Sequence, residues 1–523
     1  MVGAFAGYSS LLPDKCTLVG YNTGGSGVMT ADADGTVAVG MNALGNLTSG
    51  SHCVAVGFES SEDNTTGYKN TALGWSSFYT NQTGYSNTAI GAEALYYTTS
   101  DENVAVGDRA GVYTTGDKNT YVGFKAGFGA SGAETHNTGV GWQSLKSITT
   151  GQYNVSLGSR SGEDLTTGQL NTFVGDYAGH TTTDVDRAVA IGHESMGSGN
   201  VTSSGDGTVS IGYQALSVLT SGQQNTAVGY QSMSETTQGD YNTTLGYNTM
   251  YRDAGLANTH NTFIGASTGS GDWTTTACTL NTGVGSGVMQ GAMNGATNNT
   301  GVGVDGLNAL TTGDNNTAIG VFSLSGVTTG VQNVGVGALA GNAIQSGSNN
   351  VCIGRDADVN AENASNQIVI GQGATGTGNN EVALGNTSIS AIKAQVTSIT
   401  AYSSDERTKK DIADYDLKGV DFIKELNLKT YIYKNPADFP DEIRSDKWNE
   451  DGVERLEDPT ETQVGLIAQE VESALAKHGV GNTETYAPTQ DSGIKTLTYG
   501  NLIFPLIKAV QELSARVEEL EGK

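Results

Sequence analysis

Short apolar segments that end in glycine recur along most of the chain. Examples are CVAVG at 53–57, NTALG at 70–74 and NTAIG at 87–91, and most of the closing glycines are 17 residues apart. Within each segment small and larger aliphatic side chains alternate, with the period of a β-strand. A fixed period of this length indicates one structural unit stacked on itself. We therefore predict a mainly β protein with a parallel β-solenoid of about 22 coils over residues 16–391.

Each predicted strand has two different faces. The residue before the closing glycine is almost always Val, Ile or Leu, as at Val56, Leu73 and Ile90, and we expect this column to be a core. The opposite face is mostly small, as at Ala55 and Ala72. We expect one face to fill its own coil and the other to meet a second backbone at close range. One thin roll buries only one face, so we infer that several copies associate around a common axis, and we favour a homotrimer.

Composition agrees with a stacked shaft and excludes some partners. The chain has 74 glycines and 37% hydrophobic residues, and no proline lies between Pro13 and Pro436, which suits strands whose amides are all needed by neighbours. The net charge is −28, and so acidic a surface repels phosphate backbones and anionic lipids. We expect no nucleic-acid partner and no membrane insertion. The histidines and cysteines show no ligand spacing, so we expect no metal and no cofactor.

The repeat resembles a known family of surface fibres. Over roughly residues 16–390 the pattern N-T/S-x-[AVI]-[VIL]-G is similar to the head repeats of trimeric autotransporter adhesins, and similar repeats occur in phage tail fibres. The resemblance implies a trimeric, left-handed parallel β-roll. Those adhesins start with a signal peptide and end in a membrane barrel. Residues 1–15 show no signal-peptide pattern, so we expect synthesis in the host cytoplasm and a place in the virion tail.

The last 120 residues form a second region, because 15 of the 26 Lys and Arg residues lie there. From SDERTKKDI through GLIAQEVESAL to LTYGNLIFPLIK, residues 404–523 resemble the intramolecular chaperone domain of the S74 peptidase family, found at the ends of phage tailspikes, tail fibres and endosialidases. Residues 392–403 then form a connector. The resemblance implies that the domain nucleates trimer assembly.

The same resemblance implies that the chain cuts itself once, at the bond between Ser403 and Ser404. Ser404 would be the nucleophile and Lys409 the general base of a single-turnover serine endopeptidase. Asp405, Arg407 and Lys410 complete the family motif. A lysine acts as a base only when its pKa is depressed, and the neighbouring positive charges contribute to that.

A helix is predicted at about 499–523. Its apolar residues follow steps of three and four and are Ile503, Leu506, Val510, Leu513, Val517 and Leu520. This spacing is typical of a short coiled coil between copies, and a single helix packed on its own domain is the alternative. Nearly identical coils specify their alignment between chains poorly, so a globular end domain would set the register.

These observations predict a homotrimeric phage tail fibre or tailspike that attaches through the virion tail or another fibre protein and binds a host cell-surface receptor such as a glycan. The longer coils around Tyr251, Arg252 and Trp273 are the candidate receptor contacts. A non-viral surface adhesin or structural repeat protein with a chaperone domain is the alternative. A polysaccharide depolymerase that uses carboxylate pairs, such as Glu62 with Asp63 or Asp101 with Glu102, is a further alternative.

Overall fold

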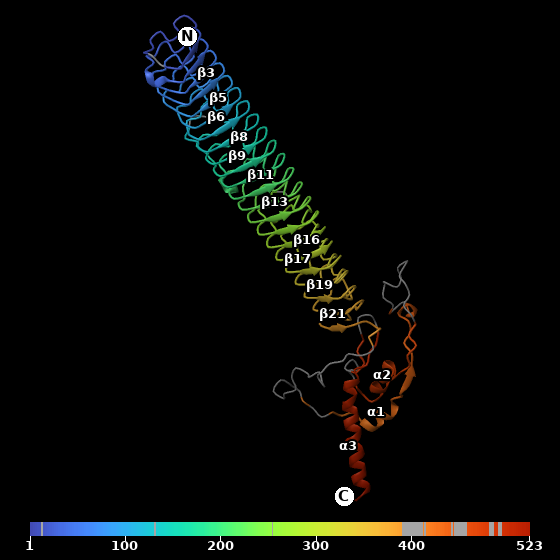
Figure 1. Cartoon of the computed structure of the whole chain (residues 1–523). Helices are drawn as coiled ribbons and strands as arrows, with labels where there is room; N and C mark the ends of the chain where they lie inside the picture. Colours follow the sequence, from blue (N-terminus) through green and yellow to red (C-terminus); the bar gives the residue numbers. More distant parts are fainter. Residues whose placement is uncertain are drawn as a thin grey trace. The chain divides into compact units, whose positions relative to one another are not determined.

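The chain folds into two compact units, Met1–Ala374 and Thr375–Lys523 (Figure 1). The computed structural model describes residues 1–11, 14–129, 132–253, 255–389, 412, 415–440, 443, 458–480, 486–489 and 494–522. The first unit is a stack of β-coils, and the second combines short strands with helices. The mainly β class predicted from the repeat is confirmed.

The first unit is a parallel β-solenoid of 21 coils, and each coil contributes one short strand. The strands are β1 (Thr17–Val19), β2 (Val37–Val39), β3 (Val54–Val56), β4 (Thr71–Leu73), β5 (Thr88–Ile90), β6 (Val104–Val106), β7 (Thr120–Val122), β8 (Thr138–Val140), β9 (Val155–Leu157), β10 (Thr172–Val174), β11 (Val189–Ile191), β12 (Val209–Ile211), β13 (Thr226–Val228), β14 (Thr243–Leu245), β15 (Thr262–Ile264), β16 (Thr282–Ser286), β17 (Thr300–Val304), β18 (Thr317–Ile319), β19 (Val334–Val336), β20 (Val351–Ile353) and β21 (Ile368–Ile370). Each strand pairs in parallel with the next one along the chain, so that Ala72 of β4 lies opposite Ala89 of β5.

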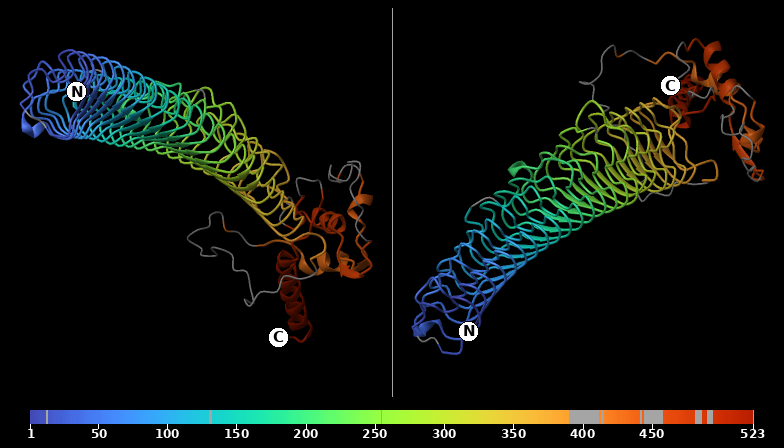
Figure 2. Two further views of the ribbon diagram at one scale, coloured as in Figure 1. Left: turned by 45° about the horizontal axis from the view of Figure 1, so that its top comes forward. Right: turned by 90° about the horizontal axis from the view of Figure 1, so that it is seen from above.

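Two longer coils contain a short 3-10 helix, η1 (Ala31–Ala33) and η2 (Ser203–Gly205). These helices accommodate extra residues without breaking the strand stack, since β1 pairs with β2 and β11 with β12 in the usual register. Figure 2 shows the same stack of coils from two further directions. Among the described residues of this unit, no inserted domain separates one coil from the next.

The strand face that points into the coil is the opposite of the one predicted. The small middle residues, such as Ala55 and Ala89, are fully buried inside the coil, whereas Val54, Leu73 and Ile319 on the other face are partly exposed. The prediction that the Val, Ile and Leu column forms the core is therefore wrong for the single coil. The small column fills the coil, and the aliphatic column lies on its outer surface.

The physical reason is that the opposite wall of each coil supplies the large side chains. Leu95 and Leu145, which follow β5 and β8 in their coils, are fully buried there and leave room only for Ala or Gly on the strand. Where the strand itself carries a ring, the facing position is glycine. A Cβ atom on Gly127 would overlap the ring of Tyr121, and one on Gly179 would lie 2.8 Å from the ring of Phe173. The interior is thus packed by complementary volumes.

The glycine that closes each strand is required by the stack. Gly57 has a φ of +144°, and a Cβ atom there would overlap the carbonyl oxygen of Gly74 in the next coil. Only glycine combines this backbone conformation with so close a backbone contact. The glycines recur every 17 residues or so in the sequence because each coil makes this contact with the next.

A ladder of buried asparagines links the coils from inside. The Asn154 backbone N–H donates to Asn137 Oδ1 at 3.0 Å, and Asn154 Nδ2 donates to Asn137 Oδ1 at 3.0 Å and to the Gly168 carbonyl at 2.9 Å. Asn171 repeats the pattern on Asn154. Two runs of this ladder comprise Asn70, Asn87, Asn103, Asn119, Asn137, Asn154 and Asn171, and Asn225, Asn242, Asn261, Asn281, Asn299, Asn316, Asn333 and Asn350. Each amide satisfies buried groups that would otherwise be costly.

The second unit is small and aperiodic. Its elements are β22 (Val382–Leu384), α1 (Gly419–Glu425), β23 (Lys429–Tyr431), η4 (Pro436–Asp438), β24 (Gln463–Gly465), α2 (Ala468–Lys477), η7 (Tyr499–Leu502) and α3 (Ile503–Leu520). Strands β23 and β24 pair antiparallel, and Leu417, Phe422, Val471 and Leu475 form the core. No helix in the described part of the chain is long and apolar enough to cross a membrane.

Candidate functional site

The outer sheet face of the solenoid presents aliphatic side chains along its length, together with Thr in many coils. We use the name outer sheet face for the outward residues of β1 to β21 that flank the buried middle residue. Its most exposed aliphatic side chains are between 36% and 48% exposed. They include Val19, Val54, Leu73, Val155, Leu157, Leu245, Val302, Ile319, Ile353 and Ile370. An exposed apolar surface that extends over so many coils marks an interaction surface.

Helix α3 carries an apolar strip of its own. Ile503, Leu506, Val510, Leu513, Val517 and Leu520 are all exposed, by 48% or more. They follow the alternating three- and four-residue steps of a coiled-coil seam. Pro505 and Ala509 lie on another face of the helix and are buried. We refer to the six exposed residues as the α3 seam, and their exposure leaves them open to a partner helix.

Glu512 fixes α3 to the start of α1. Its two carboxylate oxygens accept the backbone N–H groups of Gly419 and Val420 at 3.1 and 3.0 Å. These hydrogen bonds hold the pKa of Glu512 below its usual value, and the bond from Val420 has the larger effect. A Cβ atom on Gly419 would overlap the backbone nitrogen of Ala509, so the two helices touch closely. No local spacing in the sequence points to Glu512, because its partners lie more than 90 residues upstream.

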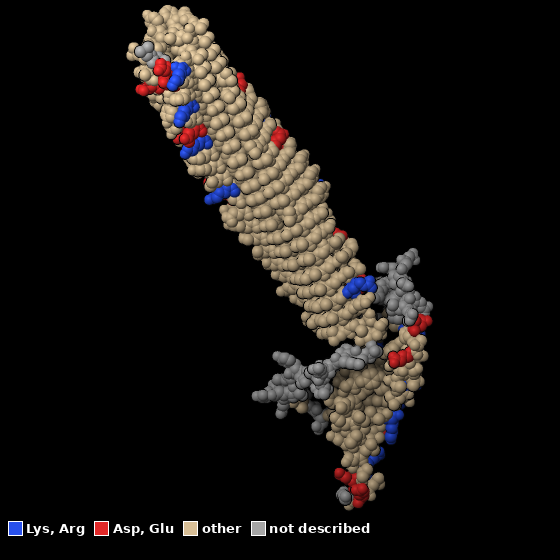
Figure 3. Space-filling model, viewed as in Figure 1, with Lys and Arg blue, Asp and Glu red and all other residues tan. Residues whose placement is uncertain are grey.

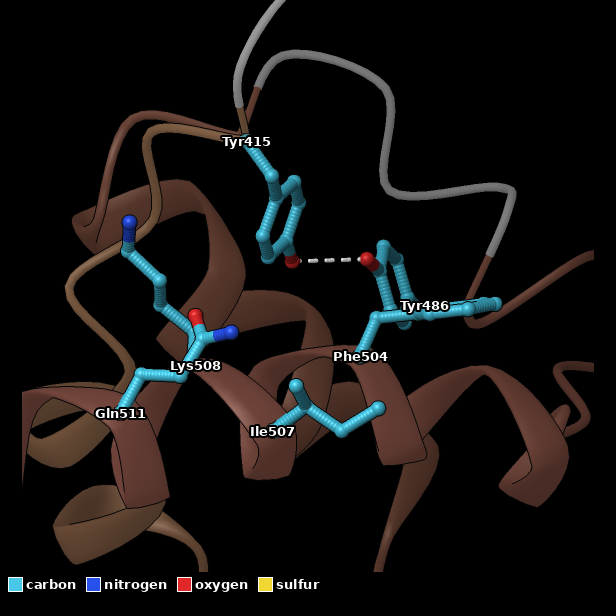
Figure 4. A pocket seen from close by; sticks show the side chains of 6 residues that line it. All are labelled: Tyr415, Tyr486, Phe504, Ile507, Lys508 and Gln511. Carbon is cyan, nitrogen blue, oxygen red and sulfur yellow. Dashed lines mark hydrogen bonds between the residues drawn. The ribbon is translucent and has the colours of Figure 1, made fainter. Parts of the chain in front are cut away.

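A pocket of about 660 Å³ lies beside α3 (Figure 4). The Tyr415 and Tyr486 hydroxyls share a hydrogen bond of 2.8 Å, and burial raises the pKa of Tyr415, with that bond as the second cause. The other lining residues belong to α3 and are Phe504, Ile507, Lys508 and Gln511. None of the lining residues forms a pair of nucleophile and base.

The predicted cleavage residues cannot be placed in this geometry. Ser404, Asp405, Arg407, Lys409 and Lys410 lie outside the described residues, as does the bond that precedes Ser404. Their roles remain predictions.

The structure brings two of the three predicted receptor contacts together. The Arg252 guanidinium lies 5.7 Å from the centre of the Tyr251 ring and pairs with Asp272 at 3.2 Å. Trp273 differs, because its side chain is fully buried and packs edge-on against Phe263 with ring centres 5.8 Å apart. Its indole therefore offers no surface to a receptor, whereas Tyr251 and Arg252 remain accessible.

The carboxylates considered for hydrolysis act in turns between coils. Asp101 Oδ1 accepts the Tyr85 N–H at 2.9 Å, and the Asp101 N–H donates to Asp117 Oδ1 at 2.8 Å. Glu62 is half-buried, and its pKa is raised by burial and then by the charges of Glu59 and Asp63. In the described parts of the chain, no cluster of His, Cys, Asp or Glu has the arrangement of a metal site.

Glu134 is a buried acid inside the solenoid. Burial raises its pKa to about 8, and its Oε2 atom has no hydrogen-bond partner among the described residues. The fully buried hydroxyl of Tyr121 is likewise unpartnered, and its pKa is raised by burial and then by Glu134. Glu134 is thus held in its neutral form at pH 7.

Aromatic residues that follow the strand glycines stack along the outside of the coils. The ring centres of Tyr213 and Tyr230 are 5.1 Å apart, those of Tyr230 and Tyr247 are 5.4 Å apart, and the rings are nearly parallel. Tyr230 is thus stacked between Tyr213 and Tyr247. These stacked rings contribute packing between coils.

Comparison with known families adds one assignment. Residues 404–480 match the family model described as chaperone of endosialidase, a range that includes α1, β23, β24 and α2. A search of curated proteins gave no match. The chain thus combines a long β-solenoid with a C-terminal region that is similar to the chaperone of endosialidase.

Proposed function

We propose that this chain is the subunit of a homotrimeric phage tail fibre or tailspike that attaches the virion to its host. The solenoid forms the shaft and carries the receptor-binding surface, and the C-terminal domain nucleates assembly of the three chains. The observation that carries the proposal is the outer sheet face, whose aliphatic side chains lie exposed along a solenoid that precedes a chaperone domain. Three such faces around one axis would bury each other.

The need for a chaperone follows from the repeat. Adjacent coils present nearly the same outward pair, such as Thr71 and Leu73 followed by Thr88 and Ile90. A slip of one coil between two chains would therefore preserve most apolar contacts. The α3 seam and the neighbouring pocket would align the three C-terminal units first, and the shafts would then associate in a single register.

We propose further that assembly ends with self-cleavage before Ser404, with Ser404 as nucleophile and Lys409 as base. This step rests on the match to residues 404–480 and on the motif residues of the sequence. Loss of the domain would leave the shaft kinetically trapped in its assembled state, because the element that directs assembly would be gone.

The test is the native and intact mass of three forms: the full chain, Ser404→Ala and a chain truncated after Ser403. We expect a trimer for the first two, loss of about 120 residues only where Ser404 is present, and misaligned or aggregated material for the truncated chain. A monomeric full chain would overturn the trimer. If the truncated chain also formed a trimer without aggregation, the chaperone role would be overturned. An uncut wild-type trimer would overturn self-cleavage alone.

Host attachment needs its own measurement. Purified full-length protein should adsorb to host cells and compete with virions that carry it, and antibodies against the solenoid should label the tail. Replacement of residues 240–300 by coils from elsewhere in the shaft should reduce adsorption if Tyr251 and Arg252 contribute. If antibodies against the solenoid label no virion, the alternative of a non-viral surface fibre would be favoured.

A further inference from the structure

One arginine of the solenoid is held between two aromatic rings. The Cζ atom of Arg160 lies 4.6 Å from the centre of the Trp142 ring and 5.3 Å from that of Tyr177. The three residues follow β8, β9 and β10 and so come from consecutive coils. Contacts on both sides favour one orientation of the planar guanidinium through cation–π attraction and stacking.

The nearby acid does not occupy the donors of this guanidinium. Glu163 is nearly buried, its Oε1 lies 2.7 Å from Lys146 Nζ, and its Oε2 lies 3.2 Å from His180 Nε2. Arg160 Nε is 3.5 Å from Glu163 Oε2, and within the described residues Arg160 makes no side-chain hydrogen bond. Glu163 therefore supports the cluster while the outer fork of Arg160 keeps its donors.

Three of the four other arginines of the solenoid differ in this respect. Arg109 donates to Glu93 at 2.7 Å, Arg187 donates to Asp206 at 3.3 Å, and Arg252 donates to Asp272 at 3.2 Å. Arg355 resembles Arg160, because its guanidinium lies 3.5 Å from the Asp356 carboxylate. Among the described arginines of the solenoid, however, Arg160 alone lies against two rings, so it combines an oriented fork with donors that remain for an acceptor from outside the chain.

The local charge also favours an anion. Lys146 and Arg160 carry two positive charges and both contact the one carboxylate of Glu163. Figure 3 shows Lys and Arg side chains along one edge of the N-terminal half of the solenoid, with Asp and Glu side chains among them. Around Glu163 itself, two cations contact one carboxylate, so an anion would meet a favourable local potential.

We infer that the cluster of Trp142, Arg160 and Tyr177 binds a saccharide that carries a carboxylate. The fork of a guanidinium accepts the two oxygens of a carboxylate in one plane. Trp142 is 41% exposed beside the fork, which gives the apolar C–H groups of a sugar ring a surface to contact. The inference rests on the proposed host-attachment function and names the ligand chemistry of one site on the shaft.

A phosphodiester would present the same oxyanion chemistry, because it too carries one charge over two free oxygens. A glycerol phosphate chain, however, has no sugar ring to lie against the exposed Trp142 beside the fork. The carboxylate is therefore the source to which the inference commits, and the phosphodiester is an outcome of the test.

The experiment is calorimetric titration of the assembled full chain with three probes: oligogalacturonate, a neutral dextran oligosaccharide and a glycerol phosphate polymer. We expect binding of oligogalacturonate only. Arg160→Gln should weaken it roughly 10- to 100-fold, since hydrogen bonds to a charged group are lost. Arg160→Lys should recover little, because the charge stays but the fork is gone. Arg187→Gln is the matched control and should change affinity by less than about twofold, because its exposed pair with Asp206 contributes little.

Several results would overturn the inference. They are no binding of oligogalacturonate by the wild-type protein, stronger binding of the glycerol phosphate polymer, full recovery by Arg160→Lys, and equal losses in Arg160→Gln and Arg187→Gln. Native mass and adsorption to host cells, measured on the same samples, separate this failure from that of the proposed function. A trimer that adsorbs to cells but ignores oligogalacturonate would refute the ligand and leave the fibre standing.

Discussion

The solenoid and the C-terminal unit are held together by opposite kinds of contact. In the solenoid, Asn137, Asn154 and Asn171 bond to one another across steps of 17 residues, and each strand pairs with its equivalent in the next coil. In the C-terminal unit, Tyr415 meets Tyr486 and Gly419 meets Glu512 across 71 and 93 residues. Repeated contacts build length but would leave alignment between chains open, whereas unique contacts define one arrangement. In the proposed assembly, length and alignment would thus be encoded in different parts of the chain.

The repeated contacts of the solenoid would be interrupted most strongly by Asn154→Leu. The substitution keeps the size of the side chain but removes acceptors and donors that serve Asn171, Asn137 and the Gly168 carbonyl. Each orphaned buried group costs roughly 1–3 kcal/mol. We expect a clear fall in the urea midpoint and increased hydrogen exchange in the coils on both sides. Thr167→Ala on an exposed turn is the control, and equal midpoints for the two variants would show that the ladder is not needed.

The outer sheet face would be tested by Ile319→Glu. Ile319 is 44% exposed in the single chain, where such a change alters stability by about 0.5 kcal/mol or less. In the proposed trimer three carboxylates would enter an apolar interface, so we expect loss of trimer and a large fall in melting temperature. Thr329→Glu, on an exposed turn of the same region, should leave both unchanged. An unaltered Ile319→Glu trimer would exclude this face as the interface.

The position of every solenoid strand could be predicted from the sequence, because the closing glycine is required by a contact that recurs in each coil. The direction of the strand faces could not, since alternation is the same whichever side points inward. A signal was nevertheless present: Tyr121, Phe173 and Phe263 are each followed by glycine at 127, 179 and 269, where Ala89 is followed by Leu95. A large residue on the strand is thus paired with a small one six residues later, and the reverse. Residues that compensate in size in this way must share the interior of the coil.

The candidate sites show a different limit of prediction. The long coil around Trp273 predicts a surface side chain, whereas in the structure the indole is buried against Phe263. Arg160 and Glu163 show no unusual local pattern, since their partners come from coils on either side. Contacts between coils become visible in a sequence only when the period is used to align them.

A smaller effect is expected from Glu134→Gln in the solenoid interior. The folded pKa of Glu134 is about 8, above the ordinary value of 4.5, so the folded state holds a proton that the unfolded state loses. The wild-type protein should therefore lose stability as pH rises from about 4.5 to 8, and the variant should lose less. Melting temperatures between pH 4 and 9 measure the difference, with exposed Glu102→Gln as control. Parallel pH profiles for wild type and Glu134→Gln would contradict the neutral buried acid.

The smallest effect should come from Glu512→Gln, which tests one unique contact of the C-terminal unit. The pKa of Glu512 lies below its ordinary value because the charged form accepts two N–H groups, so its stabilisation is present above about pH 4.5 and is lost as pH falls through the folded pKa. At pH 7 the variant should exchange the Gly419 and Val420 amides faster, and the difference from wild type should shrink below pH 4. Glu518→Gln, on the exposed surface of α3, is the control. If exchange in the solenoid also changed, the two units would be energetically coupled, and the division between length and alignment would not hold. If exchange changed only in α1 and α3, the unique contacts would be confined to the unit that sets alignment.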